Sequence, residues 1–146
     1  MYKDFGTTIV VGSTGSGKSY FMTKYINEVV TDVNNKLFLV DPKWVELTDF
    51  QEYENVTYIR ETKDFVESIF NTILSDKTGA KKYLFVDEYA ELKFDEAVHK
   101  KVKYLLKNRK ELNLQVVLVS QRPTVFCNGM KANCDTVIKL NGRNFY

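Results

Sequence analysis

The chain has 146 residues, the length of one domain with enough residues to bury a sizeable core. Its 44% hydrophobic and 27% charged residues are typical of a folded globular protein, and a net charge of +2 identifies no partner. Two cysteines without a secretory signal argue against a disulfide framework, and no apolar run is long enough to cross a membrane. We therefore expect one domain over residues 1–146, located in the cytoplasm, or in the host cytoplasm if the chain is viral.

The first predicted elements are a buried strand at Thr7–Val11, a glycine-rich loop and a helix over residues 20–30. The loop, from Gly12 to Ser19, matches the phosphate-binding pattern G-x-x-x-x-G-K-[ST] at every position. Its glycines lack a Cβ, so the backbone can turn its N–H groups inward, and the helix that follows adds the positive end of its dipole. The residues expected to bind a nucleotide are Gly12, Ser13, Thr14, Gly15, Ser16, Gly17, Lys18, Ser19 and Tyr20.

The motif also predicts the cofactors, ATP and Mg²⁺. Lys18 is expected to reach the β and γ phosphates, and the hydroxyl of Ser19 is expected to bind Mg²⁺. The alternative is a glycine- and serine-rich turn that binds nothing. At average glycine usage, a chance match in a chain this short has odds of roughly one in a few hundred, and the strand and helix on either side favour the nucleotide site further.

Strands and helices alternate along the rest of the chain. This alternation predicts an α/β fold of the P-loop NTPase (ASCE or RecA-like) class, a three-layer sandwich with a mostly parallel sheet and helices on both faces. Asn141-Gly142 is typical of a hairpin turn. The further predicted strands cover residues 36–40, 56–59, 83–86, 114–119 and 135–140, and the further predicted helices begin at residues 62 and 94, the second ending near residue 110.

Two later strands are expected to end in polar residues at the nucleotide crevice, because the carboxyl ends of parallel strands open into it. Asp87 and Glu88 follow the strand at 83–86; Asp87 is expected to hold Mg²⁺ opposite Ser19, and Glu88 to orient or deprotonate the attacking water. Gln121 follows the strand at 114–119 and is placed to touch the γ-phosphate or its water. The alternative is a set of surface polar residues at strand ends, which is less favoured beside a complete phosphate loop.

Four blocks in this order resemble the motor core of FtsK/HerA-type DNA translocases, and the likeness runs from about Thr7 to Leu140. The likeness is specific, because Asp41-Pro42-Lys43 and Ser120-Gln121-Arg122-Pro123, which lie within two of these blocks, are not general among phosphate-loop proteins. The chain is much shorter than cellular members, and this minimal core is similar to the packaging or DNA-transfer ATPases of small viruses and mobile elements. The four blocks are residues 12–19, 40–47, 85–92 and 117–124.

The resemblance implies a ring, a hexamer or pentamer, that hydrolyses ATP to move along double-stranded DNA, with a viral portal or DNA-transfer complex as a further partner. It implies catalytic roles for Lys18, Glu88 and Gln121, and a sheet in which the glutamate strand lies between the phosphate-loop strand and another. It also implies an arginine that acts on the neighbouring subunit, for which Arg109 and Arg122 are both candidates.

The expected nucleic-acid contacts are lysines outside these motifs, although a solvated helix face or a subunit interface would carry the same residues. Two other functions remain open: an assembly or export ATPase of the filamentous-phage type, and a nucleotide-dependent switch or small-molecule kinase. The candidate lysines are Lys81 and Lys82 after one loop, and Lys100, Lys101 and Lys103 on the helix predicted from residue 94.

Overall fold

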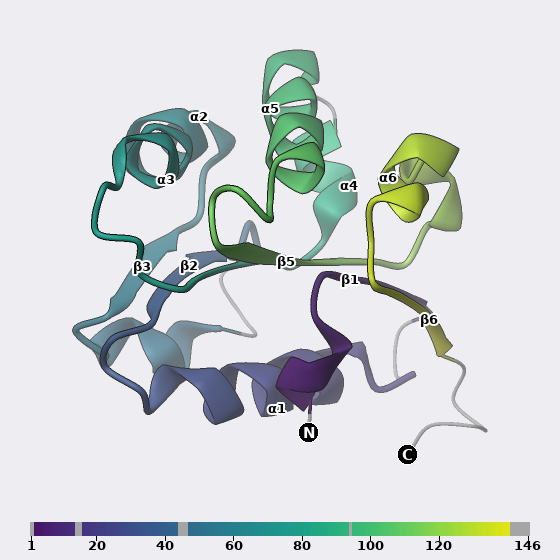
Figure 1. Cartoon of the computed structure of the whole chain (residues 1–146). Helices are drawn as coiled ribbons and strands as arrows, with labels where there is room; N and C mark the ends of the chain where they lie inside the picture. Colours follow the sequence, from purple (N-terminus) through teal and green to yellow (C-terminus); the bar gives the residue numbers. More distant parts are fainter. Residues whose placement is uncertain (1, 14–15, 44–46, 94, 141–146) are drawn as a thin grey trace.

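Six parallel strands form one sheet in the order β3-β2-β4-β5-β1-β6 (Figure 1). The structure is a computed structural model that describes residues 2–13, 16–43, 47–93 and 95–140. Every pairing in the described sheet is parallel, so the carboxyl ends of all six strands meet at one edge. The strands are β1 (Thr8–Gly12), β2 (Lys36–Val40), β3 (Val56–Ile59), β4 (Lys82–Val86), β5 (Leu114–Ser120) and β6 (Thr136–Leu140).

Helices cover both faces of the sheet, which confirms the predicted three-layer α/β fold (Figure 1). One face carries α1 (Lys18–Val30) and the short η1 (Tyr2–Phe5), and the other carries the remaining labelled helices. Among the described residues, no helix is both long enough and apolar enough to cross a membrane. The other helical segments are η2 (Thr48–Glu52), α2 (Thr62–Phe65), η3 (Val66–Phe70), α3 (Asn71–Ser75), α4 (Tyr89–Lys93), α5 (Glu96–Lys107), η4 (Pro123–Val125) and α6 (Asn128–Ala132).

Each face of the sheet has its own hydrophobic core, because alternate residues of a strand point to opposite faces. In β1, Val10 packs into the core under α1, whereas Ile9 and Val11 pack into the core under α5. All three are buried, as expected for a strand covered by helices on both sides. This double burial explains why β1 is a continuous apolar run in the sequence and why it can hold the loop that follows it in a fixed place.

Two expectations need correction. The glutamate strand β4 lies between β2 and β5, and β5 separates it from the phosphate-loop strand β1, because β5 pairs with both. The helix predicted from residue 94 to 110 is α5, which is shorter at both ends, because the Asp95 side chain caps it by accepting hydrogen bonds from the amides of Ala97 and Val98; the separate short helix α4, which precedes it, was not predicted. The hairpin turn predicted at residues 141–142 lies outside the described residues.

Candidate nucleotide-binding site

The glycine-rich loop joins the end of β1 to the start of α1, as its motif predicts. Gly17 precedes the first helical residue with a φ of 101°, a left-handed conformation that favours glycine. The amide of Ser16 donates to the carbonyl of Ser13 at 3.1 Å, and the amide of Phe21 donates to the carbonyl of Gly17 at 2.9 Å. Thr14 and Gly15 lie outside the described residues. The described part of the loop is therefore a closed turn at the amino end of a helix, a geometry suited to an anion.

Lys18 is buried at the base of this turn. Its ammonium group donates to the carbonyl of Gly12 at 2.7 Å and to that of Ser13 at 3.2 Å. These two bonds hold the positive charge beside the loop backbone, where a phosphate would lie. Ser19 follows in the first turn of α1 and is partly buried, whereas Tyr20 is 45% exposed, with the Lys24 ammonium 5.3 Å from its ring centroid.

The loop approaches the neighbouring strand so closely that Gly12 has no room for a side chain. A Cβ on Gly12 would overlap the Ser16 hydroxyl and would lie 3.1 Å from the carbonyl oxygen of Leu140 on β6. Ser16 is itself buried, and its hydroxyl oxygen has no hydrogen-bond partner among the described residues. Gly12 is therefore required by packing.

The predicted acidic pair lies at the end of β4, on the same edge of the sheet as the loop. Asp87 is 5% exposed, and its amide donates to the carbonyl of Val40 on β2 at 3.0 Å. Glu88 has a φ of 53°, a left-handed conformation that is uncommon for a residue with a side chain and that costs about 1–3 kcal/mol. Strain of this kind is often found at functional sites, and here it coincides with the residue expected to orient water.

Glu88, Gln121 and Arg122 line one small cavity of about 110 Å³. Gln121 and Arg122 follow β5, and the amide of Arg122 donates to the Ser120 hydroxyl at 3.1 Å, which fixes the turn after the strand. The structure therefore brings together the ends of β4 and β5, as predicted. The other residues lining the cavity are Lys43, Ala90 and Glu91.

Residues beyond the motifs support this edge. Tyr89, directly after Glu88, is fully buried; its hydroxyl is hydrogen-bonded to Nδ1 of His99 on α5, and its ring stacks on Phe126 at 5.5 Å. Burial lowers the pKa of His99, and the nearby positive charge of Lys103 lowers it further. Sequence reasoning missed this link, because Tyr89 and His99 belong to different helices and no local pattern connects them.

Asp41, at the end of β2, is a second residue that sequence reasoning did not assign. It is fully buried and accepts hydrogen bonds from the amide of Leu47 at 3.1 Å and from the hydroxyl of Tyr58 at 2.9 Å. The Asp-Pro-Lys block that supported the family resemblance therefore begins with a carboxylate that ties β2 to β3 and to the segment beyond it. Among the described residues, no group of three or more acidic, cysteine or histidine side chains could hold a metal ion.

The two candidate arginines lie at opposite edges of the sheet. Arg109 donates to the carbonyl of Leu106 at 3.1 Å and pairs with Asp135 at 3.4 Å. The other oxygen of Asp135 accepts from the amide of Thr7, at the start of β1, so Arg109 belongs to the amino-terminal edge. Arg122 is exposed and belongs to the carboxyl-terminal edge beside Glu88. Of these two arginines, Arg122 is the one at the same edge of the sheet as the phosphate loop.

The proposed nucleic-acid contact of Lys82 is wrong, because its side chain is buried. Its ammonium group pairs with Asp76 at 3.2 Å and donates to the carbonyls of Ala80 and Leu112, each at 2.9 Å. With three acceptors inside the fold, this lysine has a structural role. The partly buried Lys81 lies 5.8 Å from the ring centroid of Tyr83, and the remaining candidates, Lys100, Lys101 and Lys103, lie on α5.

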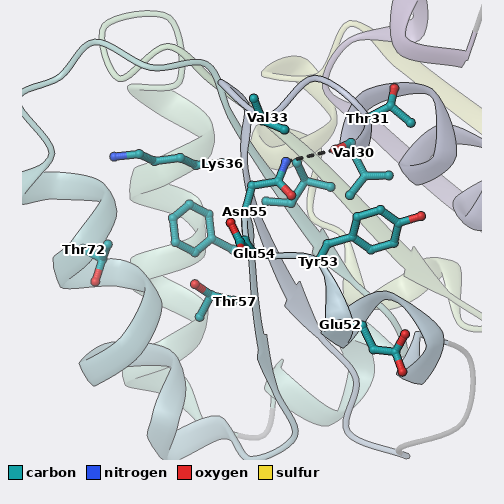
Figure 2. A pocket seen from close by; sticks show the side chains of 12 residues that line it. Val30, Thr31, Val33, Lys36, Glu52, Tyr53, Glu54, Asn55, Thr57 and Thr72 are labelled. Carbon is teal, nitrogen blue, oxygen red and sulfur yellow. Dashed lines mark hydrogen bonds between the residues drawn. The ribbon is translucent and has the colours of Figure 1, made fainter.

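A cavity of about 850 Å³ lies at the opposite edge of the sheet from the phosphate loop (Figure 2). It is lined by the end of α1 and by the first residues of β2 and β3, including Val30, Lys36 and Thr57. Asn55 reaches across it and donates to the carbonyl of Val30 at 3.0 Å, so its amide ties α1 to the start of β3. The cavity is therefore separate from the candidate nucleotide site.

Comparison with known proteins gives one family match. A family model described as the viral superfamily 1 RNA helicase core domain matches residues 8–106, which include the phosphate loop and the Asp87-Glu88 pair. No curated protein matches the chain significantly.

Several solved structures share the fold. EssC (ATPases 2 and 3) from Geobacillus thermodenitrificans has a TM-score of 0.80 at 14% identity, covering 98% of this chain and 35% of that one. B204, the DNA-packaging ATPase from Sulfolobus Turreted Icosahedral Virus, has a TM-score of 0.71 at 21% identity, covering 92% and 74%. The pCW3 conjugation coupling protein TcpA has a TM-score of 0.69 at 18% identity, covering 90% and 48%.

These neighbours include FtsK/HerA-type ATPases, as the sequence resemblance implied. The chain spans 16 to 35% of the EssC and EccC chains that it matches. At these identities the structural matches establish the P-loop fold, and together with the family match they support an ATPase.

Proposed function

The chain belongs to the family of viral superfamily 1 RNA helicase core domains, and from this membership we propose that it is a Mg²⁺-dependent ATPase that moves nucleic acid. The observation that carries the proposal is the meeting of three strand ends at one edge of the sheet: β1 with the phosphate loop, β4 with Asp87 and Glu88, and β5 with Gln121. Binding, metal and water-orienting groups are therefore contributed by different strands to one site.

Each residue then has a distinct role. The loop amides and Lys18 would neutralise the phosphates, and Ser19 and Asp87 would hold Mg²⁺. Glu88 orients or deprotonates water, and Gln121 contacts the γ-phosphate or that water. The buried position of Asp87 suits a metal ligand, since a carboxylate with little water around it gains more from a cation. Mg²⁺ supplies charge neutralisation on the phosphates when it is bound.

We further propose that the motor acts on DNA as a homo-oligomeric ring during genome packaging or DNA transfer. B204 is a DNA-packaging ATPase and TcpA is a conjugation coupling protein, and both share this fold. Arg122 is the better candidate for acting on a neighbouring nucleotide, because it is exposed, whereas Arg109 is held by Asp135 and by the carbonyl of Leu106. RNA is the alternative to DNA as the nucleic acid that is moved, because the matching family is one of RNA helicase core domains.

Protein export is a second candidate function, supported by the likeness to EccC, which was solved in complex with a signal sequence peptide. The two functions differ in what accelerates hydrolysis. Nucleic acid should raise the hydrolysis rate of a nucleic-acid translocase, and a signal peptide should raise the hydrolysis rate of an export ATPase.

The test is ATP hydrolysis by the wild type with no addition, with duplex DNA, with single-stranded DNA, with RNA and with a signal peptide, each at low and moderate salt. We expect nucleic acid to stimulate the rate and the stimulation to fade as salt rises, because backbone contacts release counterions. Glu88→Gln should still bind ATP but lose about 100-fold or more in turnover, and Lys18→Ala should lose both. A rate that rises only with peptide would support export, and normal turnover by Lys18→Ala would reject the site.

A further inference from the structure

The outward face of α5 carries a lysine stripe, which we define as Lys100, Lys103 and Lys107. All three are exposed, and they recur every three or four residues, so they lie on one side of the helix opposite the buried Val98 and Val102. Between residues 97 and 110 the sequence has six lysines and arginines and no acid. No acidic side chain of the described residues forms an ion pair with any member of the stripe.

The helix dipole does not account for this stripe. Cations near the carboxyl end of a helix are stabilising, but the effect is confined to the last turn. Lys107 is in the last turn, whereas Lys100 and Lys103 are in the middle of the helix. From Lys100 to Lys107 the helix rises about 10 Å, so the three positive charges form a short row along one side of the helix. The spacing therefore suits a polyanion with regularly repeated charges.

Tyr104 lies on the same face as the lysine stripe and is 49% exposed. Its ring makes an edge-to-face contact with Phe70, at 6.1 Å between centroids, and the Lys101 ammonium lies 5.3 Å from the Phe70 centroid. Phe70 therefore holds the Tyr104 ring from one side and leaves part of it open to solvent. An aromatic ring held beside a row of cations is the combination that binds unpaired bases together with their backbone.

We propose that the outward face of α5 is a binding site for single-stranded nucleic acid, in which the lysine stripe contacts successive phosphates and Tyr104 stacks on a base. The proposal rests on the proposed function and specifies both the site and the strandedness of the polymer. A duplex would use the lysines alone, because its bases are already stacked on one another. Single-stranded substrate would therefore depend on Tyr104, and duplex would not.

The test measures binding of fluorescent single-stranded DNA, single-stranded RNA and duplex DNA of equal length by anisotropy, from about 50 to 200 mM salt. Replacing the stripe with Lys100→Gln, Lys103→Gln and Lys107→Gln together should weaken binding by about tenfold or more and reduce the salt slope for single strands by about 2. Tyr104→Ala should weaken single-strand binding by about fivefold or more and leave duplex binding unchanged, while Tyr104→Phe should bind normally. Circular dichroism checks that each variant is folded.

A control variant with Lys24→Gln, Lys63→Gln and Lys77→Gln removes the same charge from exposed positions on other elements. If the control loses as much affinity as the stripe variant, overall charge accounts for binding and the proposal fails. It also fails if Tyr104→Ala binds single strands as the wild type does. If the wild type binds no nucleic acid at all, the proposed function fails together with the site. Failure of the site alone is distinguishable, because the wild type then still binds nucleic acid.

Discussion

Gly12→Ala is the substitution that tests the packing of the phosphate loop most directly. The added Cβ would overlap the Ser16 hydroxyl and would lie 3.1 Å from the Leu140 carbonyl oxygen and 3.2 Å from the Leu140 Cβ. Overpacking of this kind costs about 1–3 kcal/mol. Alanine also reduces the entropy of the unfolded chain, which offsets about 0.4–1 kcal/mol. We therefore expect a net loss of about 1–2 kcal/mol in the free energy of unfolding, with a fall of about 2–8 °C in Tm.

The assay is urea unfolding of the wild type, Gly12→Ala, Ser16→Ala and the double variant. Ser16→Ala removes a buried hydroxyl whose oxygen has no partner among the described residues, so alone it should change stability by no more than about 0.5 kcal/mol. In the double variant the overlap between the Cβ added at position 12 and the Ser16 hydroxyl is gone. We therefore expect the double variant to be at least about 1 kcal/mol more stable than the sum of the two single effects predicts. Leu140 remains in place, so recovery should be incomplete.

Two results would refute this reasoning. If Gly12→Ala unfolds at the same urea concentration as the wild type, the close approach of the loop to β6 is wrong. If Gly12→Ala is destabilised but Ser16→Ala restores nothing, the cost arises at the Leu140 backbone and the hydroxyl is not the obstacle. ATP binding by the double variant then shows whether the loop still accepts phosphate after the repacking.

Two further predictions concern the groups that support the site. Tyr89→Phe should lower the free energy of unfolding by about 1 kcal/mol, because it removes the hydroxyl that is hydrogen-bonded to Nδ1 of His99 and keeps the stacked ring. Urea unfolding at neutral pH measures this change, and an unchanged midpoint would contradict the prediction. The amide and hydroxyl of Thr78, with Lys82 and Lys36, hold the pKa of Asp76 well below its usual 3.8. The pKa of Asp76 is lower in the folded than in the unfolded state, so the carboxylate stabilises the fold above about pH 4, and this stability is lost as the pH falls further. The midpoint of urea unfolding should therefore drop below about pH 4 in the wild type and much less in Asp76→Asn.

The local patterns of the sequence determined the elements and most of the site. An apolar run followed by G-x-x-x-x-G-K-S places a loop between strand and helix, because each part of the motif depends on neighbours within a few residues. Likewise, the apolar run before Asp87-Glu88 and the one before Gln121 predicted two strand ends. Since all strands of such a fold run parallel, those ends were expected at one edge, and the structure has them there.

What the tertiary structure alone decided depends on contacts between distant residues. The place of β5 between β4 and β1 is a matter of strand order, and the burial of Lys82 depends on its contacts with Asp76, Ala80 and Leu112. The left-handed backbone at Glu88 lies in the short turn between the end of β4 and the start of α4. The hydrophobic pattern of the sequence does not predict these features. A period of two residues in a strand, or of 3.6 in a helix, indicates which face of that element is buried but not which other element covers it.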